Sequence, residues 1–444
     1  MKKTITILAV IFLVSLGFGQ NMPWLYQPTN EVHPIGNNYM EFQDYSGGSS
    51  SYYHDGIDIM AGYGNRPVFS SNTGVMTHLS TGTMYGGLMI GQAVAGGQGW
   101  LYWHIPSSSM QFSVGDSIYT GEFIGRAATW SVYSFHHVHF NKVVGTGGYP
   151  WSWYSSTDNP LLYLQPYDDP DAPFFHNAYQ NNIFAFAQNG TSNYLNPVNL
   201  SGQVDIIANI ADVINDPAWL ESPFQVRYWI NGPVSISPTM SFYAAGWCPA
   251  DNTINVPYRE DATCLTQGNY TVRNYFFNVT NTDGDSTVEL SDANYSWNTT
   301  ICPGGNYMVF VEAKDRFGNT TMDSMQVTVA GGANFSLTFE PVNPPIIIPS
   351  TGGAFEYSIS VSNTGTGGGV IDVWIMVTLP SGSTAGPLLL AENLNIPAGG
   401  TVSRIRAQSI PPLAPAGEYY YWCSIGDYPG MVLQTDGFNF TKQP

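Results

Sequence analysis

The chain has 444 residues, of which only 10% are charged, and it contains 47 glycines, 30 prolines and 14% aromatic residues. Its formal net charge of −19 argues against nucleic acid and anionic lipid as partners, because like charges repel. The length favours two or three domains over a single core, and the composition favours short strands joined by tight turns.

The first 20 residues have the pattern of a secretory signal peptide. Lys2 and Lys3 precede an apolar run from Ile5 to Leu16, and small residues follow this run. The run is too short to span a bilayer, and no later run is long and apolar enough to do so. We therefore expect residues 1–20 to be removed and the protein to be secreted to the periplasm, the cell surface or the medium, with no transmembrane segment.

Residues 21–166 are predicted to form the first domain, built from antiparallel strands. Short apolar runs such as 87–90 and 99–103 are separated by glycines, and no stretch has a convincing helical period. Residues 167–173 are predicted to be a linker, because prolines and like charges resist packing. Every candidate catalytic residue precedes this linker, so we expect a chain that ends near Gln165 to fold and to act without the rest.

Two β-sandwich domains are predicted after the linker, over residues 174–331 and 332–444. Apolar residues alternate in segments such as 204–210 and 355–361, and turns rich in Asn, Gly and Pro separate the strands. The last domain resembles the immunoglobulin-like modules of exported bacterial proteins. The predicted fold class is thus mostly β, with an antiparallel-sheet domain followed by two immunoglobulin-like sandwiches that would bind a cell-surface polymer.

Three of the four cysteines, Cys248, Cys264 and Cys302, lie in the second predicted domain. Thiols of exported proteins meet oxidising conditions and pair readily. We expect one disulfide among these three residues, with partners that the sequence leaves open. No C-x-x-C pair is present to suggest a metal cluster.

Most histidines lie in three segments of the first predicted domain. The first segment, His-Asp-Gly-Ile-Asp, contains His54 and Asp58, the second contains His104, and the third contains His137 and His139. Alternate residues of a strand point the same way, so His137 and His139 would share one face. Two imidazoles and one carboxylate with an open fourth position are the ligand set of a catalytic zinc ion.

The order of these segments resembles the lysostaphin-type (LytM-type) zinc endopeptidases, which cut peptide bonds in bacterial cell walls. The family's H-x-G-x-D is matched at 54–58, its Y-x-H-L at 102–105 and its H-x-H-F at 137–140. The sequence departs from the family pattern at 127–130, at 134–136 and at Asn141, positions that would shape the wall of the groove. The resemblance is confined to the first predicted domain.

The resemblance implies that His54, Asp58 and His139 bind Zn²⁺, and that His104 and His137 are catalytic residues beside the open coordination position. The ion would lower the pKa of a bound water towards about 7 and polarise the scissile carbonyl. Either accessory histidine would accept the proton of the water or stabilise the oxyanion. The implied function is a zinc metallo-endopeptidase acting on the stem peptides or cross-links of peptidoglycan, in cell-wall remodelling or lysis.

Two other interpretations are open from the sequence. A purely structural zinc site would need a fourth protein ligand, and no such ligand is evident. Some members of the family have lost metal ligands and act as non-catalytic activators, and the sandwiches suit a wall-binding or adhesion protein. The presence of all three ligands and both accessory histidines favours the enzyme.

Overall fold

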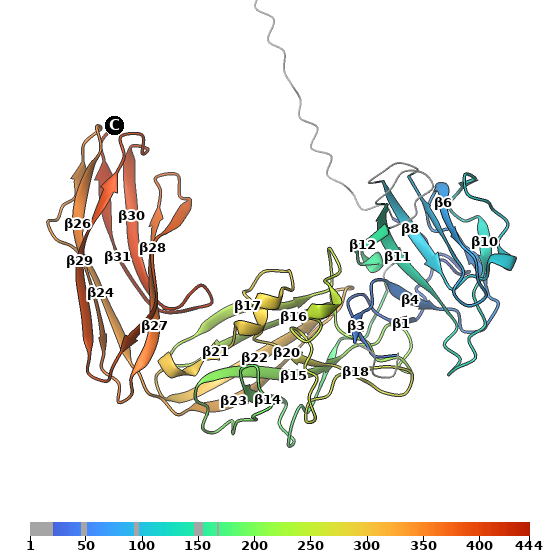
Figure 1. Cartoon of the computed structure of the whole chain (residues 1–444), viewed down its shortest axis with the longest axis horizontal. Helices are drawn as coiled ribbons and strands as arrows, with labels where there is room; N and C mark the ends of the chain where they lie inside the picture. Colours follow the sequence, from blue (N-terminus) through green and yellow to red (C-terminus); the bar gives the residue numbers. More distant parts are fainter. Residues whose placement is uncertain (1–20, 46–50, 93–96, 146–153, 167) are drawn as a thin grey trace, which may run out of the picture.

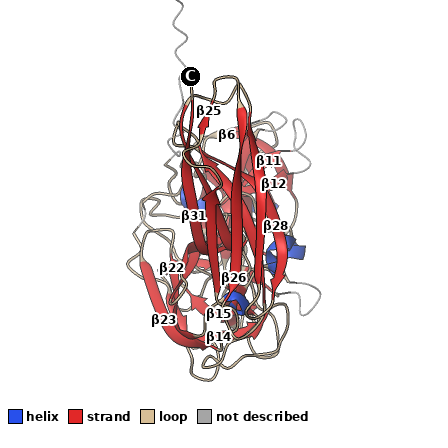
Figure 2. Ribbon diagram, turned by 90° about the vertical axis from the view of Figure 1, so that its left-hand side faces the viewer, coloured by secondary structure: helices blue, strands red, loops and turns tan. Residues whose placement is uncertain are grey.

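The computed structural model describes residues 21–45, 51–92, 97–145, 154–166 and 168–444, so the predicted signal peptide lies outside the described residues. The described residues form strands, loops and short 3₁₀ turns, without any α-helix (Figure 2). They make up three units that follow one another along the chain (Figure 1). The predicted mostly β fold class is confirmed. Within these residues, no helix is long and apolar enough to cross a membrane.

The first unit is organised around an antiparallel sheet of eight strands. In sheet order they are β1 (Ile35–Asn37), β4 (Ile57–Met60), β11 (His137–Gly145), β8 (Gln98–Trp103), β7 (Gly87–Gly91), β6 (Gly74–Ser80) and β9 (Ser117–Ile118), with β12 (Tyr154–Asp158) beside β11. Two short pairs flank this sheet, β2 (Phe42–Gln43) with β3 (Tyr52–Tyr53) and β5 (Pro67–Phe69) with β10 (Phe123–Arg126). Because β4 and β8 lie on either side of β11, the three histidine segments occupy neighbouring strands.

The second unit is a sandwich of a five-stranded and a four-stranded sheet. The first sheet contains β13 (Phe174–His176), β15 (Gln203–Ala211), β14 (Phe184–Gln188), β20 (Phe276–Asn278) and β21 (Trp297–Asn298). The second runs in the order β17 (Ile236–Tyr243), β16 (Gln225–Asn231), β22 (Gly305–Lys314) and β23 (Thr320–Val329). A separate short hairpin pairs β18 (Gln267–Gly268) with β19 (Arg273–Asn274).

The third unit, orange to red in Figure 1, is a second sandwich with a hydrophobic core of its own. One sheet contains β24 (Phe335–Pro341), β26 (Gly353–Asn363) and β29 (Thr401–Ile410). The other contains β25 (Ile347–Ile348), β31 (Met431–Lys442), β30 (Gly417–Asp427), β27 (Gly369–Thr378) and β28 (Thr384–Ile396). The 3₁₀ turns of the three units are Ser107–Ser109, Pro160–Leu162, Asp251–Thr253, Leu290–Asn294 and Thr299–Ile301.

One hydrophobic core runs through the first two units. It joins buried residues from both sides of the predicted linker, such as Phe42 and Tyr258, whose ring centroids are 5.6 Å apart. The fully buried carboxylate of Glu41 also faces Arg273 of β19, at 3.6 Å. The segment 167–173 therefore connects two units that bury part of their surface against each other, and we expect the first to depend on the second for stability.

All four cysteines are free thiols, so the prediction of a disulfide among Cys248, Cys264 and Cys302 is wrong. Cys264 packs beside Ala178 in a small separate cluster, whereas Cys302 lies in the main core. Burial raises the pKa of Cys302 and of Cys423 to about 12. These two thiols are therefore protonated near neutral pH and react slowly with oxidants.

We expect the purified, unreduced protein to contain four free thiols. After unfolding without a reductant, mass spectrometry of alkylated peptides should find each cysteine modified. The midpoint of thermal unfolding should also be the same with and without a reducing agent, because no cross-link restrains the unfolded chain. A pair of peptides joined through sulfur would contradict this prediction.

Candidate metal centre

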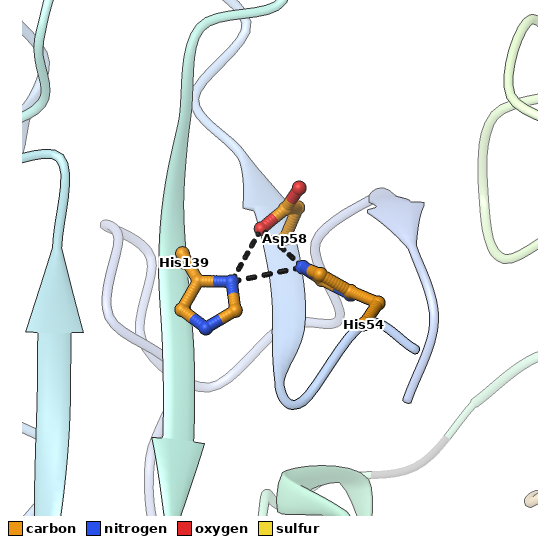
Figure 3. Close-up of side chains that lie close together, drawn as sticks. All are labelled: His54, Asp58 and His139. Atoms are coloured by element: carbon orange, nitrogen blue, oxygen red, sulfur yellow. Dashed lines mark hydrogen bonds and ion pairs between the residues drawn. The ribbon is translucent and has the colours of Figure 1, made fainter. Parts of the chain in front are cut away.

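The three histidine segments meet where β4, β11 and β8 are neighbours. Asp58 of β4 pairs in register with His139 of β11, and His139 also pairs with Trp103, the residue before His104. His54 lies in the loop before β4. Strand pairing thus brings His54 and His139, which are 85 positions apart, into contact, and Figure 3 shows both rings pointing towards Asp58.

The ligand atoms face one another at short distances. His54 Nε2 lies 2.8 Å from His139 Nδ1, and Asp58 Oδ1 lies 3.1 Å from both nitrogens. His54 Nδ1 donates to the carbonyl oxygen of Asn38 at 3.0 Å, so a neutral His54 ring has its lone pair on Nε2. His139 Nε2 lies 3.2 Å from Asp55 Oδ1 and donates to it, which leaves Nδ1 with the lone pair when the ring is neutral.

This donor set fits a metal ion. Two nitrogen lone pairs and a carboxylate oxygen within 3.1 Å of one another repel unless a cation or a proton lies among them. Zinc–nitrogen bonds of about 2.0–2.1 Å place two tetrahedral ligand atoms about 3.3 Å apart, close to the spacing in this site. Two imidazoles and one carboxylate are also the protein ligands of known catalytic zinc sites.

The surrounding charges favour an ionised carboxylate at the centre. Burial alone would raise the pKa of Asp58, but nearby His137 and His54 and a hydrogen bond with His139 hold it well below its usual range. Burial would lower the pKa of His139, yet hydrogen bonds with Asp55 and Asp58 raise it to about 10. The two acidic groups therefore make the site attractive to a cation.

Residues 52–147 match the family model described as peptidase family M23. This segment is an M23 domain. The match begins just before His54 and extends beyond His139, so the domain contains the whole donor set. The resemblance predicted from the order of the motifs is confirmed for this part of the chain.

No curated protein matches the chain. Among solved structures, the peptidase lysostaphin from Staphylococcus simulans is 16% identical, over 45% of this chain and 90% of that one, with a TM-score of 0.25. The CARDB domain of the PF1109 protein from Pyrococcus furiosus is 14% identical, over 25% of this chain and 90% of that one, with a TM-score of 0.19. Alkylpurine DNA glycosylase AlkC from Pseudomonas fluorescens is 15% identical, over 25% of this chain and only 31% of that one, with a TM-score of 0.20.

The two predicted accessory histidines, His104 and His137, lie beside the donor set. His104 Nδ1 donates to the carbonyl oxygen of Met84 at 2.8 Å, and His137 Nδ1 donates to that of Phe135 at 2.7 Å. Since a carbonyl oxygen only accepts, Nε2 of each neutral ring is unprotonated. His137 Nε2 lies 3.6 Å from Asp58 Oδ2, and the two accessory rings are 4.6 Å apart.

The environment keeps both accessory rings neutral. Burial, reinforced by His137, lowers the pKa of His104 well below its usual value, and burial also lowers the pKa of His137. Both rings are therefore neutral near neutral pH, and each has an unprotonated Nε2 because Nδ1 donates to a carbonyl oxygen. The backbone of His104, directly after β8, has a positive φ of 64°, which is uncommon outside glycine. Such backbone strain is concentrated where a side chain must be placed for function.

A cavity of about 320 Å³ opens onto these histidines. Its walls are rich in aromatic side chains, which are Tyr45, Tyr52, Tyr85, Trp103, Trp130, Phe135 and Tyr270. Trp130 belongs to the segment that departs from the family pattern, and its Nε1 donates to the hydroxyl of Tyr270 in the second unit at 3.0 Å. Phe135, from the departure at 134–136, also lines the cavity, whereas Asn141 is buried and lies 3.4 Å from Asp55 instead of on the cavity wall.

Gly56 of the H-x-G-x-D motif is required by the space available to it. A Cβ atom at this position would lie 2.7 Å from the carbonyl oxygen of Phe140 and 2.8 Å from His139 Nε2. Any larger residue would push the loop that carries His54 away from β11. The φ angle of Gly56 does not lie in the left-handed region, so this glycine is required by space and not by backbone conformation.

Three residues that the sequence did not point to, Asn37, Arg273 and Tyr45, form a hydrogen-bonded group beside Asp58. Asn37 Nδ2 donates to Asp58 Oδ2 at 2.5 Å, and Asn37 Oδ1 accepts from Arg273 at 2.7 Å and from Tyr45 at 3.1 Å. Asn37 and Arg273 are 236 positions apart, so no local spacing signals their contact. Nothing in the sequence around Arg273 distinguishes it from the other Lys and Arg residues of the chain.

Proposed function

We propose that the protein is a secreted zinc metallo-endopeptidase that hydrolyses peptide bonds in the stem peptides or cross-links of peptidoglycan. The proposal is carried by the convergence of His54, Asp58 and His139 in an M23 domain, with one side open and two neutral histidines beside it. Secretion is supported by the leader pattern of residues 1–20.

The ion would be held by His54 Nε2, His139 Nδ1 and Asp58 Oδ1. When bound, zinc lowers the pKa of water towards about 7 and polarises a carbonyl group. Nε2 of His137 or of His104 accepts the proton of the attacking water and returns it to the leaving amine. The hydrogen bonds from Nδ1 to backbone carbonyls hold both rings in the orientation that this transfer requires.

A non-catalytic wall-binding or activator protein is the alternative function. The complete donor set and the two neutral accessory histidines favour the enzyme, because a scaffold would need neither. Within the proposal, the second and third units serve to hold the enzyme on a cell-surface polymer.

Hydrolysis of purified peptidoglycan tests the proposed function. We expect the protein to generate shorter muropeptides, detected by mass spectrometry, together with new free amino groups. Removal of metal with a chelator should abolish the reaction, and one equivalent of zinc should restore it. His78→Ala, a substitution on β6 outside the donor set, should retain both zinc and activity. A protein that holds zinc but cuts no bond in any wall preparation would favour the non-catalytic alternative.

A further inference from the structure

The β18–β19 hairpin of the second unit reaches the segment that supports the metal centre. Asn269, in the turn of the hairpin, donates through Nδ2 to Asp44 Oδ1 at 3.0 Å, and the backbone N–H of Gly268 donates to the same oxygen at 3.3 Å. A Cβ atom at Gly268 would lie 1.9 Å from the carbonyl oxygen of Phe42, so only glycine allows this approach. The hairpin is therefore shaped to dock onto the first unit.

Arg273 on this hairpin connects the second unit to a metal ligand through one intervening side chain. Its guanidinium donates to Asn37 Oδ1 at 2.7 Å and to the hydroxyl of Tyr45 at 2.8 Å. Tyr45 donates in turn to Asn37 Oδ1 at 3.1 Å, and Asn37 Nδ2 donates to Asp58 Oδ2 at 2.5 Å. The connection runs without a gap from the second unit to the carboxylate.

These donors fix which end of the Asn37 amide faces Asp58. Two donors, from Arg273 and Tyr45, point at one end, so that end must be the oxygen, and the NH₂ group must face the carboxylate. The NH₂ group donates a hydrogen bond to Asp58 Oδ2, and Asp58 Oδ1 faces the nitrogens of His54 and His139. Asp58 is thus oriented to give a metal ion one oxygen in a defined direction.

Arg273 is itself held in place. Its guanidinium donates to the carbonyl oxygens of Gly36 and Leu220, and it lies 3.6 Å from the carboxylate of Glu41. The ring of Trp219 covers it, with a distance of 5.0 Å from the guanidinium carbon to the ring centroid. Its side chain is 6% exposed, so solvent hardly competes for its hydrogen bonds. A planar group with several donors suits this task better than the single ammonium of lysine.

We propose that Arg273 is a positioning residue of the metal centre, which orients Asp58 by fixing the amide of Asn37. The second unit is then part of the metal centre in addition to its place beside the first unit. The inference rests on the metal-binding part of the proposed function and is independent of which bond the enzyme cuts.

Zinc affinity, measured on the full-length protein by competition with a chromogenic chelator, tests this inference. We expect Asn37→Ala and Arg273→Lys each to weaken zinc binding by about 10–100-fold, the usual effect of removing a residue that orients a metal ligand. The matched control is Arg259→Lys, because Arg259 is also buried in the second unit and its partners Asp205 and Asp261 lie in the same unit. This control should bind zinc as the native protein does, even if its unfolding midpoint falls.

The double variant Asn37→Ala/Arg273→Lys separates a positioning role from general stability. If Arg273 acts through Asn37, the double variant should bind zinc no more weakly than Asn37→Ala alone. A multiplicative loss, or an equal loss in Arg259→Lys, would overturn the proposal. Should Arg273→Lys fail to fold, native zinc affinity in Asn37→Ala would overturn it as well. A native protein that binds zinc but cleaves no substrate would refute the proposed function and leave this test valid.

Discussion

Replacing His139 with alanine is expected to remove both zinc and peptidase activity, whereas replacing His137 with alanine should leave zinc bound and still lower kcat/KM by about 10²–10⁴-fold. His139 Nδ1 lies 2.8 Å from His54 Nε2 and 3.1 Å from Asp58 Oδ1, so its loss leaves a metal ion with two protein ligands. His137 is anchored to the carbonyl oxygen of Phe135 and contributes no atom to the donor set.

The two histidines offer a well-matched comparison, because both lie on β11 and are separated by a single residue. Metal analysis of both purified variants, together with hydrolysis of a defined muropeptide, would test the prediction. Loss of zinc from His137→Ala with retention in His139→Ala would reverse the assigned roles. Full activity in both variants would contradict the proposed enzyme altogether.

A shortened chain of residues 21–166 is expected to fail to fold stably, whereas a chain of residues 21–332 should fold and bind zinc. The shorter chain loses Tyr258 and the rest of the second unit from the shared core, and it exposes apolar residues such as Phe42 that this unit covers. Burying a large apolar side chain contributes about 1.5–3 kcal/mol, so exposing several of them costs as much as the whole stability of many domains, about 5–15 kcal/mol.

Urea unfolding of the two shortened chains, followed by tryptophan fluorescence, would measure this difference. The chain of residues 21–332 should unfold cooperatively, because it retains the core that the first two units share. The deleted third unit has a hydrophobic core of its own. The chain of residues 21–166 should show no cooperative transition and no stoichiometric zinc binding. A cooperative transition and one equivalent of zinc in the shorter chain would show that the shared core is dispensable, as the sequence analysis expected.

Local patterns in the sequence were sufficient to predict the β-rich fold and the grouping of the histidine segments. Alternating apolar residues reflect the period of a strand, and this period depends only on neighbours along the chain. The spacing of His54 and Asp58, and of His137 and His139, placed each pair on one short segment. The order of the motifs then indicated the family of residues 52–147.

The tertiary structure decided the features that depend on contacts between distant segments. The sequence suggested a disulfide because three cysteines lie near one another along the chain, but Cys264 and Cys302 occupy separate clusters. The prolines near residue 170 suggested independent domains, but the core continues from Phe42 to Tyr258 across this segment. Proximity along the chain, like a proline-rich segment, does not determine which surfaces pack together.

The support of the metal centre also became visible only in three dimensions. The three candidate ligands lie in short motifs, because they belong to neighbouring strands of one sheet and to the loop before one of them. Arg273, by contrast, contacts Asn37 from a hairpin that lies 236 positions further along the chain. A hydrogen bond between such distant residues leaves no periodic trace in the sequence. The grouping of the candidate ligands could therefore be predicted from local patterns, while the residues proposed to orient them could be found only from the packing of the second unit against the first.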